Sequence, residues 1–226
     1  MDVVLTCEHA GNRVPARYRA RFVGAERLLA SHSGWDPGAL SVSRLLAKRW
    51  RAPLITCETT RLLVDTNRSP HNPAVFSRFT RSLPVGEREA LLERHRDHWD
   101  RVRAALDAAG PRVLHVAVHS FTPVLRGETR AMDVGLLYDP SRAPERETAI
   151  AWQRRLRERH HDLRVRRNAP DRGATDGLTT ALRRERSARR YVGIEIELNQ
   201  RVVATRAGQR TLAAALAALR PVPDAT

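Results

Sequence analysis

Short, almost wholly apolar runs alternate along the sequence with longer segments of helical periodicity, and this pattern limits the fold more than any other feature. The expected strands are Val3–Cys7, Pro53–Cys57, Val113–Val118, Val134–Tyr138, an edge strand at Leu163–Arg166, and Tyr191–Leu198. The expected helices are Pro37–Trp50, Gly86–Ala109, Arg146–Arg159, Thr175–Glu185 and Gln209–Leu219. Strands that lack polar alternation are buried on both faces, which is typical of a parallel sheet covered by helices. We therefore predict an α/β fold over residues 1–226: a single three-layer domain with a mixed, mostly parallel sheet and helices on both faces.

Length and composition narrow the class of protein. A chain of 226 residues fits one domain with its own core. No apolar run reaches the roughly 18 residues that span a membrane, and the first residues indicate a strand rather than a signal peptide. The two cysteines, Cys7 and Cys57, are too few for a disulfide framework. We expect a cytoplasmic protein without a membrane partner.

The net charge of +15 raises the question of nucleic-acid binding. The arginines are spread over helical segments instead of being gathered with aromatic residues, which make up only 5% of the chain. We interpret them as a solvated surface and expect no nucleic-acid partner. A small anionic substrate would be attracted by the same field. The oligomeric state is left open.

Polar residues follow the apolar strands at their carboxyl ends, where ligands bind in sheets of this kind. His9 follows the first strand and His119 follows another. Asp36 stands before the first long helix, where it is either the helix N-cap or a metal ligand. His32, four residues earlier, is an alternative ligand or a substrate contact. Two histidines and a carboxylate with an open position are the usual catalytic zinc arrangement.

Glu195 and Glu197 lie on the same face of a strand otherwise made of Ile, Val and Leu. Two carboxylates on a buried strand are costly unless they are paired or functional. One is therefore expected to be a general base beside a metal-activated water, and the other to orient a ligand or pair with Arg. His115 lies deeper on its strand and is interpreted as a core or supporting histidine.

Two loops carry further candidates. Arg61 and Arg68 flank a short apolar segment; they either bind a substrate carboxylate or form a buried pair with Asp65. The loop at residues 168–180 is either a lid carrying Arg172 or a surface connection, with a helix cap at Thr175 or Asp176.

Other hydrolase types are disfavoured. Cys7 and His9 form a conceivable nucleophile pair, but Cys7 lies a step deeper in the strand. The chain has no Gly-x-Ser-x-Gly and no His-Glu-x-x-His motif. It also lacks Walker A and Rossmann glycine patterns.

Six blocks resemble the N-formylglutamate amidohydrolase family, in that family's order. They are Cys-Glu-His-Ala-Gly-Asn-Arg-Val-Pro (7–15), His-Ser-Gly-Trp-Asp-Pro-Gly-Ala (32–39), Thr-Arg-Leu-Leu-Val-Asp-Thr-Asn-Arg-Ser-Pro (60–70), Val-His-Ser-Phe-Thr-Pro-Val-Leu (118–125), Asp-Val-Gly-Leu-Leu-Tyr-Asp-Pro (133–140) and Gly-Ile-Glu-Ile-Glu-Leu-Asn-Gln (193–200). The resemblance implies a phosphorylase/hydrolase-like α/β fold, shared with zinc carboxypeptidases and cell-wall zinc amidases.

The same resemblance implies Zn²⁺ held by three residues: His9, Asp36 and His119. It implies Glu197 as the general base, with Glu195 as helper. The implied substrate-binding residues are Arg61, Asn67, Arg68, Arg126 and His32. The implied reaction is hydrolysis of an N-acyl amino acid such as N-formylglutamate. The alternative is a zinc amidase that cuts peptide or cell-wall amides, which would need a long open groove.

Overall fold

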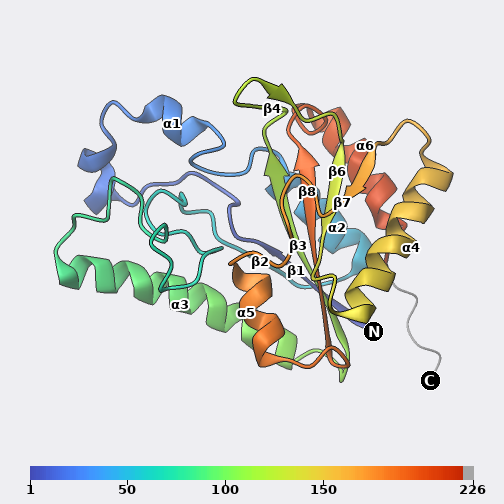
Figure 1. Ribbon diagram of the computed structural model, residues 1–226. Coiled ribbons are helices and arrows are strands. Elements are labelled where there is room, and N and C mark those ends of the chain that lie inside the picture. The colour runs from blue at the N-terminus through green and yellow to red at the C-terminus, as the bar shows by residue number, and fades with distance from the viewer. Residues whose placement is uncertain (221–226) are drawn as a thin grey trace.

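Six strands form one central sheet in the computed structural model, which describes residues 1–220 (Figure 1). The strands are β1 (Asp2–Cys7), β2 (Leu54–Thr56), β3 (Val113–Phe121), β6 (Val134–Leu137), β7 (Val165–Arg167) and β8 (Tyr191–Asn199). Their order is β2-β1-β3-β8-β6-β7, with β2, β1, β3 and β8 parallel to one another. The β6 strand runs antiparallel to β8 and parallel to the edge strand β7. The predicted mixed, mostly parallel sheet is confirmed.

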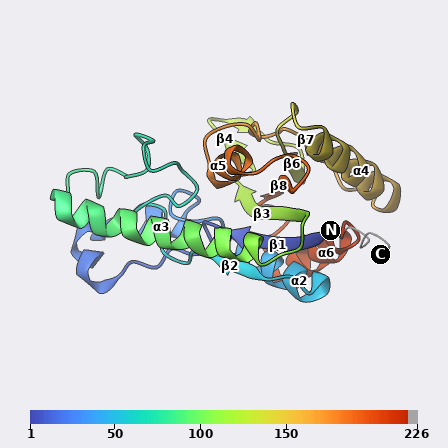
Figure 2. The same cartoon turned by 90° about the horizontal axis from the view of Figure 1, so that it is seen from below.

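Helices cover both faces of this sheet. They are α2 (Ala39–Trp50), α3 (Val85–Asp107), α4 (Ala143–Arg159), α5 (Leu178–Glu185) and α6 (Arg206–Ala217). The helices α2, α4 and α6 pack on one face through a large apolar core, and α3 and α5 pack on the other through a smaller one (Figure 2). Beyond the β2 edge, a third apolar cluster joins loops to η1 (Ala16–Phe22) and α1 (Glu26–Ala30).

The two faces of the sheet differ in chemistry because side chains alternate along each strand. On β8, Ile194 and Ile196 point into the large core, whereas Glu195 and Glu197 belong to the opposite face. On β3, His115 and His119 share that opposite face. The polar face thus belongs to the α3 and α5 side of the molecule, and it places the predicted site residues there.

Four predicted helix starts were wrong by two or three residues. The α4 and α6 helices begin at Ala143 and Arg206 instead of Arg146 and Gln209. The α2 helix begins at Ala39 instead of Pro37, and Asp36 makes no side-chain cap. Its N-cap residue is Gly38, whose φ of +84° turns the chain between Asp36 and the helix and so frees the Asp36 carboxylate. The α5 helix begins at Leu178, and neither Thr175 nor Asp176 caps it.

The sequence also missed three small elements: η1, α1 and a two-stranded ribbon of β4 (Val124–Leu125) and β5 (Glu128–Thr129). Such short elements carry too few residues for periodicity to reveal them. Both cysteines are free thiols. Among residues 1–220, no helix combines the length and the apolar character that crossing a membrane requires. The last part of the predicted domain, residues 221–226, lies outside the described residues.

Candidate active site

A cavity of about 370 Å³ opens on the polar face of the sheet. Of the predicted site residues, it is lined by His9, His32, Asp36, Arg61, Asn67, Arg68, His119, Glu195 and Glu197. The carboxyl ends of β1 and β3 meet there, as expected for a sheet of this type. A larger cavity of about 630 Å³, lined by residues of β2, α3 and neighbouring loops, contains none of the predicted site residues. The chemistry of the side chains therefore identifies the smaller cavity as the candidate active site.

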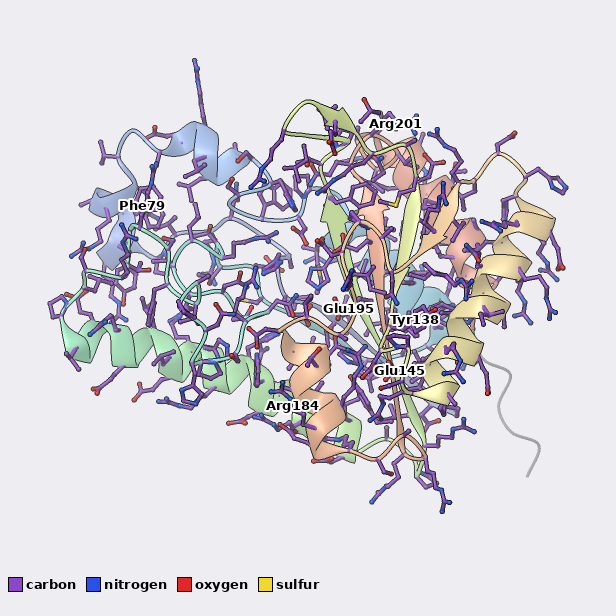
Figure 3. The ribbon with its side chains drawn as sticks, in the orientation of Figure 1. Phe79, Tyr138, Glu145, Arg184, Glu195 and Arg201 are labelled. Carbon is purple, nitrogen blue, oxygen red and sulfur yellow. The ribbon has the colours of Figure 1, made fainter. Side chains whose placement is uncertain are left out.

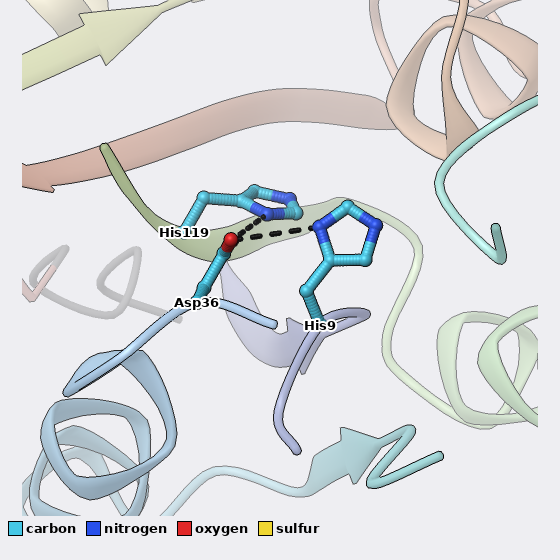
Figure 4. A group of neighbouring side chains, drawn as sticks. All are labelled: His9, Asp36 and His119. Atoms are coloured by element: carbon cyan, nitrogen blue, oxygen red, sulfur yellow. Dashed lines mark hydrogen bonds and ion pairs between the residues drawn. The ribbon is translucent and has the colours of Figure 1, made fainter. Parts of the chain in front are cut away.

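His9, Asp36 and His119 come from three separate segments and lie together in the lining of this cavity (Figure 4). All three are buried, with 4%, 1% and 3% of their surfaces exposed. The Asp36 Oδ2 atom lies 2.9 Å from His119 Nδ1 and 3.5 Å from His9 Nδ1. One donor atom from each residue lies within 4.8 Å of the other two. This spacing allows three side chains to bind one ion.

The second ring nitrogen of each histidine faces another buried carboxylate. His9 Nε2 lies 2.6 Å from Asp65 Oδ1, and His119 Nε2 lies 3.0 Å from Glu8 Oε2. A carboxylate on Nε2 holds a proton on that nitrogen and leaves Nδ1 facing Asp36. The sequence singled out neither Glu8 nor the His9–Asp65 pair. For Glu8 the available signal was its position directly before His9.

The donor set fits a zinc ion. His9 Nδ1 is buried, and it makes no hydrogen bond with any residue in the part of the chain that the structure describes. A buried nitrogen without a partner is costly in a folded protein, and a cation bound there would satisfy it. Two imidazole nitrogens and a carboxylate oxygen are ligands that Zn²⁺ takes in catalytic sites.

Charges in the cluster stabilise one another. Burial works against the charge of Asp36, but Arg61 and the two histidines outweigh it and hold the pKa of Asp36 well below its usual range. Burial likewise opposes the charged form of His119, yet Asp36 and Glu8 raise the pKa of this ring well above its ordinary value. Without a metal, His119 therefore carries a proton that an incoming ion must displace.

Glu195 and Glu197, both on β8, line the same cavity as this cluster (Figure 3 labels Glu195). The Cα atom of Glu197 is paired with that of His119 across the β3–β8 ladder. Burial raises the pKa of Glu197 to about 8 and also raises the pKa of Glu195. Glu197 Oε2 has no hydrogen-bond partner among residues 1–220. A carboxyl group in this state is well suited to exchange protons near neutral pH.

The predicted substrate contacts have different surroundings. Arg61 donates a hydrogen bond to Asp36, so its charge is already paired. Asn67 Oδ1 accepts a hydrogen bond from Leu178 N (3.1 Å) at the start of α5, and Asn67 Nδ2 lies 3.4 Å from His119 Nε2. Arg68 lines the cavity, with Nε 3.8 Å from Asp65 Oδ2. Asp65 lies closer to His9 (2.6 Å) than to Arg68, so we interpret Asp65 mainly as the partner of His9.

The remaining predicted residues lie at or beyond the edge of the site. His32 Nδ1 is 3.2 Å from Asp36 Oδ1, so it supports the carboxylate from the side away from His9. Arg126 is exposed at the turn between β4 and β5 and does not line the cavity. Arg172 is also exposed outside the cavity, although other residues of its loop contribute to the wall. His115 is a core residue that hydrogen-bonds with Thr6 Oγ1 (2.8 Å) and the Tyr191 hydroxyl (2.7 Å).

The chain is an α/β protein whose candidate site lies at the carboxyl ends of its central strands. A family model described as N-formylglutamate amidohydrolase matches residues 1–204. The chain belongs to the N-formylglutamate amidohydrolase family, a family of hydrolases that act on amide bonds.

Two solved structures have a similar fold. A gene product of Agrobacterium tumefaciens is 32% identical, with a TM-score of 0.80 over 97% of this chain and 88% of that one. The N-formylglutamate amidohydrolase of Ralstonia eutropha JMP134 is 19% identical, with a TM-score of 0.72 over 97% of this chain and 91% of its own. The second likeness concerns the fold alone. No curated protein matches the sequence.

Proposed function

We infer that this protein is a zinc-dependent hydrolase of small N-acyl amino acids, with N-formylglutamate as the leading substrate. Family membership supports the reaction class. The observation that carries the metal assignment is the pair of buried histidines that each present Nδ1 to Asp36 and Nε2 to a carboxylate. The cavity of about 370 Å³ is of the size that small-molecule sites have.

In this proposal, His9, Asp36 and His119 hold the ion, and Asp65 and Glu8 orient the two rings. When bound, the ion supplies Lewis-acid polarisation of the acyl group and makes a nearby water more acidic. Because positive charge favours ionised carboxylates, the pKa of Glu197 falls in the loaded site and the group becomes a base. Glu197 then takes a proton from the attacking water and delivers it to the leaving amine nitrogen, so that the carboxylic acid and the free amino acid are released.

Arg68 is assigned to the substrate's α-carboxylate. It lines the cavity beside Asp65 and therefore lies on the His9 side of the site. A guanidinium group binds a carboxylate through two parallel hydrogen bonds. Asn67, which reaches toward His119, is positioned to contact the acyl-amide group.

The test is a screen of N-formyl, N-acetyl and N-carbamoyl amino acids with zinc-loaded protein, with metal content measured in parallel. We expect close to one zinc per chain, and we expect Glu197→Gln to abolish turnover while zinc remains bound. Glu195→Gln, on the same strand, is the matched control and should retain partial activity. Less than about half an equivalent of zinc, with no activity restored by added zinc, would refute the metal assignment.

The alternative substrate class, peptide or cell-wall amides, is an outcome of the same screen. Turnover of a peptidoglycan fragment without turnover of any N-acyl amino acid would favour it. The compact cavity supports the small substrate instead, because a polymer needs an extended groove. The cytoplasmic location stays a prediction.

A further inference from the structure

We propose that His98 on α3 is a positioning residue of the candidate metal site, acting through Glu8 on the candidate ligand His119. This inference rests on the proposed function, and it extends the site to a helix that contributes no residue to the lining of the active-site cavity. His98 did not stand out in the sequence, because its neighbours Arg96 and Asp97 are typical of an exposed helix face.

The side chain of His98 is buried and faces Glu8. Only 2% of its surface is exposed, and it belongs to the wall of the larger cavity of about 630 Å³. His98 Nε2 lies 4.0 Å from Glu8 Oε1, and neither atom makes a hydrogen bond with any residue from 1 to 220. Because both groups are buried, solvent screens the attraction between them only weakly. Each is therefore an electrostatic partner of the other.

The arginine one turn along the helix determines which nitrogen of His98 carries the proton. Arg101 Nη2 lies 3.3 Å from His98 Nδ1, and a guanidinium group can only donate hydrogen bonds. Nδ1 therefore accepts, and a ring with one proton carries it on Nε2, the nitrogen that faces Glu8. The same Arg101 atom donates to Thr56 O (3.3 Å) at the end of β2, which holds the arginine against the sheet.

Glu8 joins His98 to the metal site, because each of its two oxygens faces a histidine. Oε1 faces His98, and Oε2 lies 3.0 Å from His119 Nε2. Burial opposes the charge of Glu8, but the two histidines outweigh it and hold the pKa of this carboxyl well below its usual range. A contact at both oxygens fixes the rotation of the carboxylate. Without His98, rotation of the group would displace the oxygen that orients His119.

Hydrogen bonds hold α3 in place relative to Glu8. Trp99, next to His98, donates from Nε1 to Thr66 O (2.8 Å). Thr66 Oγ1 in turn donates to the backbone carbonyl of Glu8 (3.1 Å). The helix, the loop that carries Thr66 and the end of β1 are thus tied together. This support keeps His98 at a fixed position, as a residue that orients another requires.

The experiment compares His98→Leu with His98→Gln in a zinc titration against a competing chelator. Leucine keeps an apolar side chain in the buried site but removes the polar contact, whereas the amide of glutamine restores an N–H that can face Glu8. Val102→Ala is the matched control for general destabilisation, because Val102 is buried one turn further along α3. We expect His98→Leu to bind zinc about 3- to 10-fold more weakly than the wild type, and the other two variants to stay within about twofold of it. The loss is smaller than for residues that contact a ligand directly, because His98 acts through Glu8.

Proton NMR of the metal-free proteins provides a readout without zinc or turnover. A buried imidazole N–H that donates to a carboxylate exchanges slowly with water and resonates far downfield, so the contact between His119 and Glu8 has its own signal, assigned by isotope labelling. We expect the signal in the wild type, in His98→Gln and in Val102→Ala. In His98→Leu it should shift or broaden, because Glu8 is no longer held at its second oxygen.

The two readouts separate the inference from the proposed function. If the NMR signal depends on His98 in this way but the wild type binds no zinc, the proposed function fails and the positioning of Glu8 stands. The inference is overturned if His98→Leu keeps the wild-type signal, or if the wild type has no such signal. In a protein that binds zinc, it is also overturned if the affinity of His98→Leu stays within about twofold of the wild type, or if His98→Gln or Val102→Ala loses as much affinity as His98→Leu.

Discussion

Replacing Asp65 by Asn tests whether the carboxylate behind His9 tunes the metal site. The Asp65 Oδ1 atom lies 2.6 Å from His9 Nε2 in a buried cluster. Burial opposes the charge of Asp65, but His9 outweighs it and holds the pKa of this carboxyl well below its usual range. The same Oδ1 atom accepts a hydrogen bond from Asn67 N (2.9 Å), and the amide oxygen of an Asn can keep both contacts. The substitution therefore removes the charge with little change of shape.

The expected loss can be worked out from this contact. A hydrogen bond to a charged group contributes about 1.5–3 kcal/mol, against about 0.5–1.5 kcal/mol for a neutral one, so loss of the charge alone is expected to cost at least about fivefold in a binding constant. Substitution of residues that hold metal-ligating histidines costs about 10- to 100-fold in metal affinity. We expect Asp65→Asn to weaken zinc binding by about 10- to 100-fold and to lower activity at limiting zinc.

The assay is a zinc titration against a competing chelator, with thermal unfolding of the metal-free proteins as a check on folding. Asp176→Asn is the control, because Asp176 is also a carboxylate of the cavity wall but is bonded to Ser69 and Asn72 instead of a histidine. Zinc affinity of Asp65→Asn within about threefold of the wild type would show that Asp65 only shapes its loop, contrary to the argument from its contact with His9.

Three further predictions use the same cluster and the core. After dialysis, the Asp36→Asn variant should no longer contain one zinc per chain, whereas the His32→Gln variant should. Metal analysis measures both, and the reverse result would make His32 the ligand. The pKa of His119 is raised, so zinc must displace a proton from this ring. Zinc affinity should therefore fall as pH falls from 8 to 6, by up to about tenfold per pH unit for each proton displaced. A chelator titration at both pH values that finds no change would count against His119 as a ligand. Arg183→Leu removes one of the two arginines that pair with the fully buried Glu145, and Arg142 remains. It should lower the free energy of unfolding by about 1–3 kcal/mol, while the exposed Arg184→Leu on the same helix should change it by less than about 0.5 kcal/mol. Denaturant unfolding measures both values, and similar values for the two would refute a stabilising buried pair.

The sheet could be predicted from the sequence because its signals are local. Strands such as Val113–Val118 are apolar apart from one histidine, and this composition already indicates cover on both faces. Alternation along Tyr191–Leu198 likewise placed Glu195 and Glu197 on one face, and both line the cavity. Element ends were less certain, as at Asp36, where a turn at Gly38 replaces the expected cap.

The geometry of the candidate site was decided by contacts between distant parts of the chain. His9 and Asp65 are separated by 56 residues, and His119 and Asp36 by 83. No local pattern encodes which nitrogen of a histidine faces which carboxylate, since this depends on how strands and loops pack. The same holds for Arg126 and Arg130: the sequence offers two arginines four residues apart, and only the ribbon between them places one at an exposed tip and the other in the cavity wall. The sequence by itself thus determined the layers of the fold and the residue types available for chemistry, because periodicity and composition are local properties. The tertiary structure alone decided how those residues are paired and oriented, because packing brings together side chains that the chain keeps far apart.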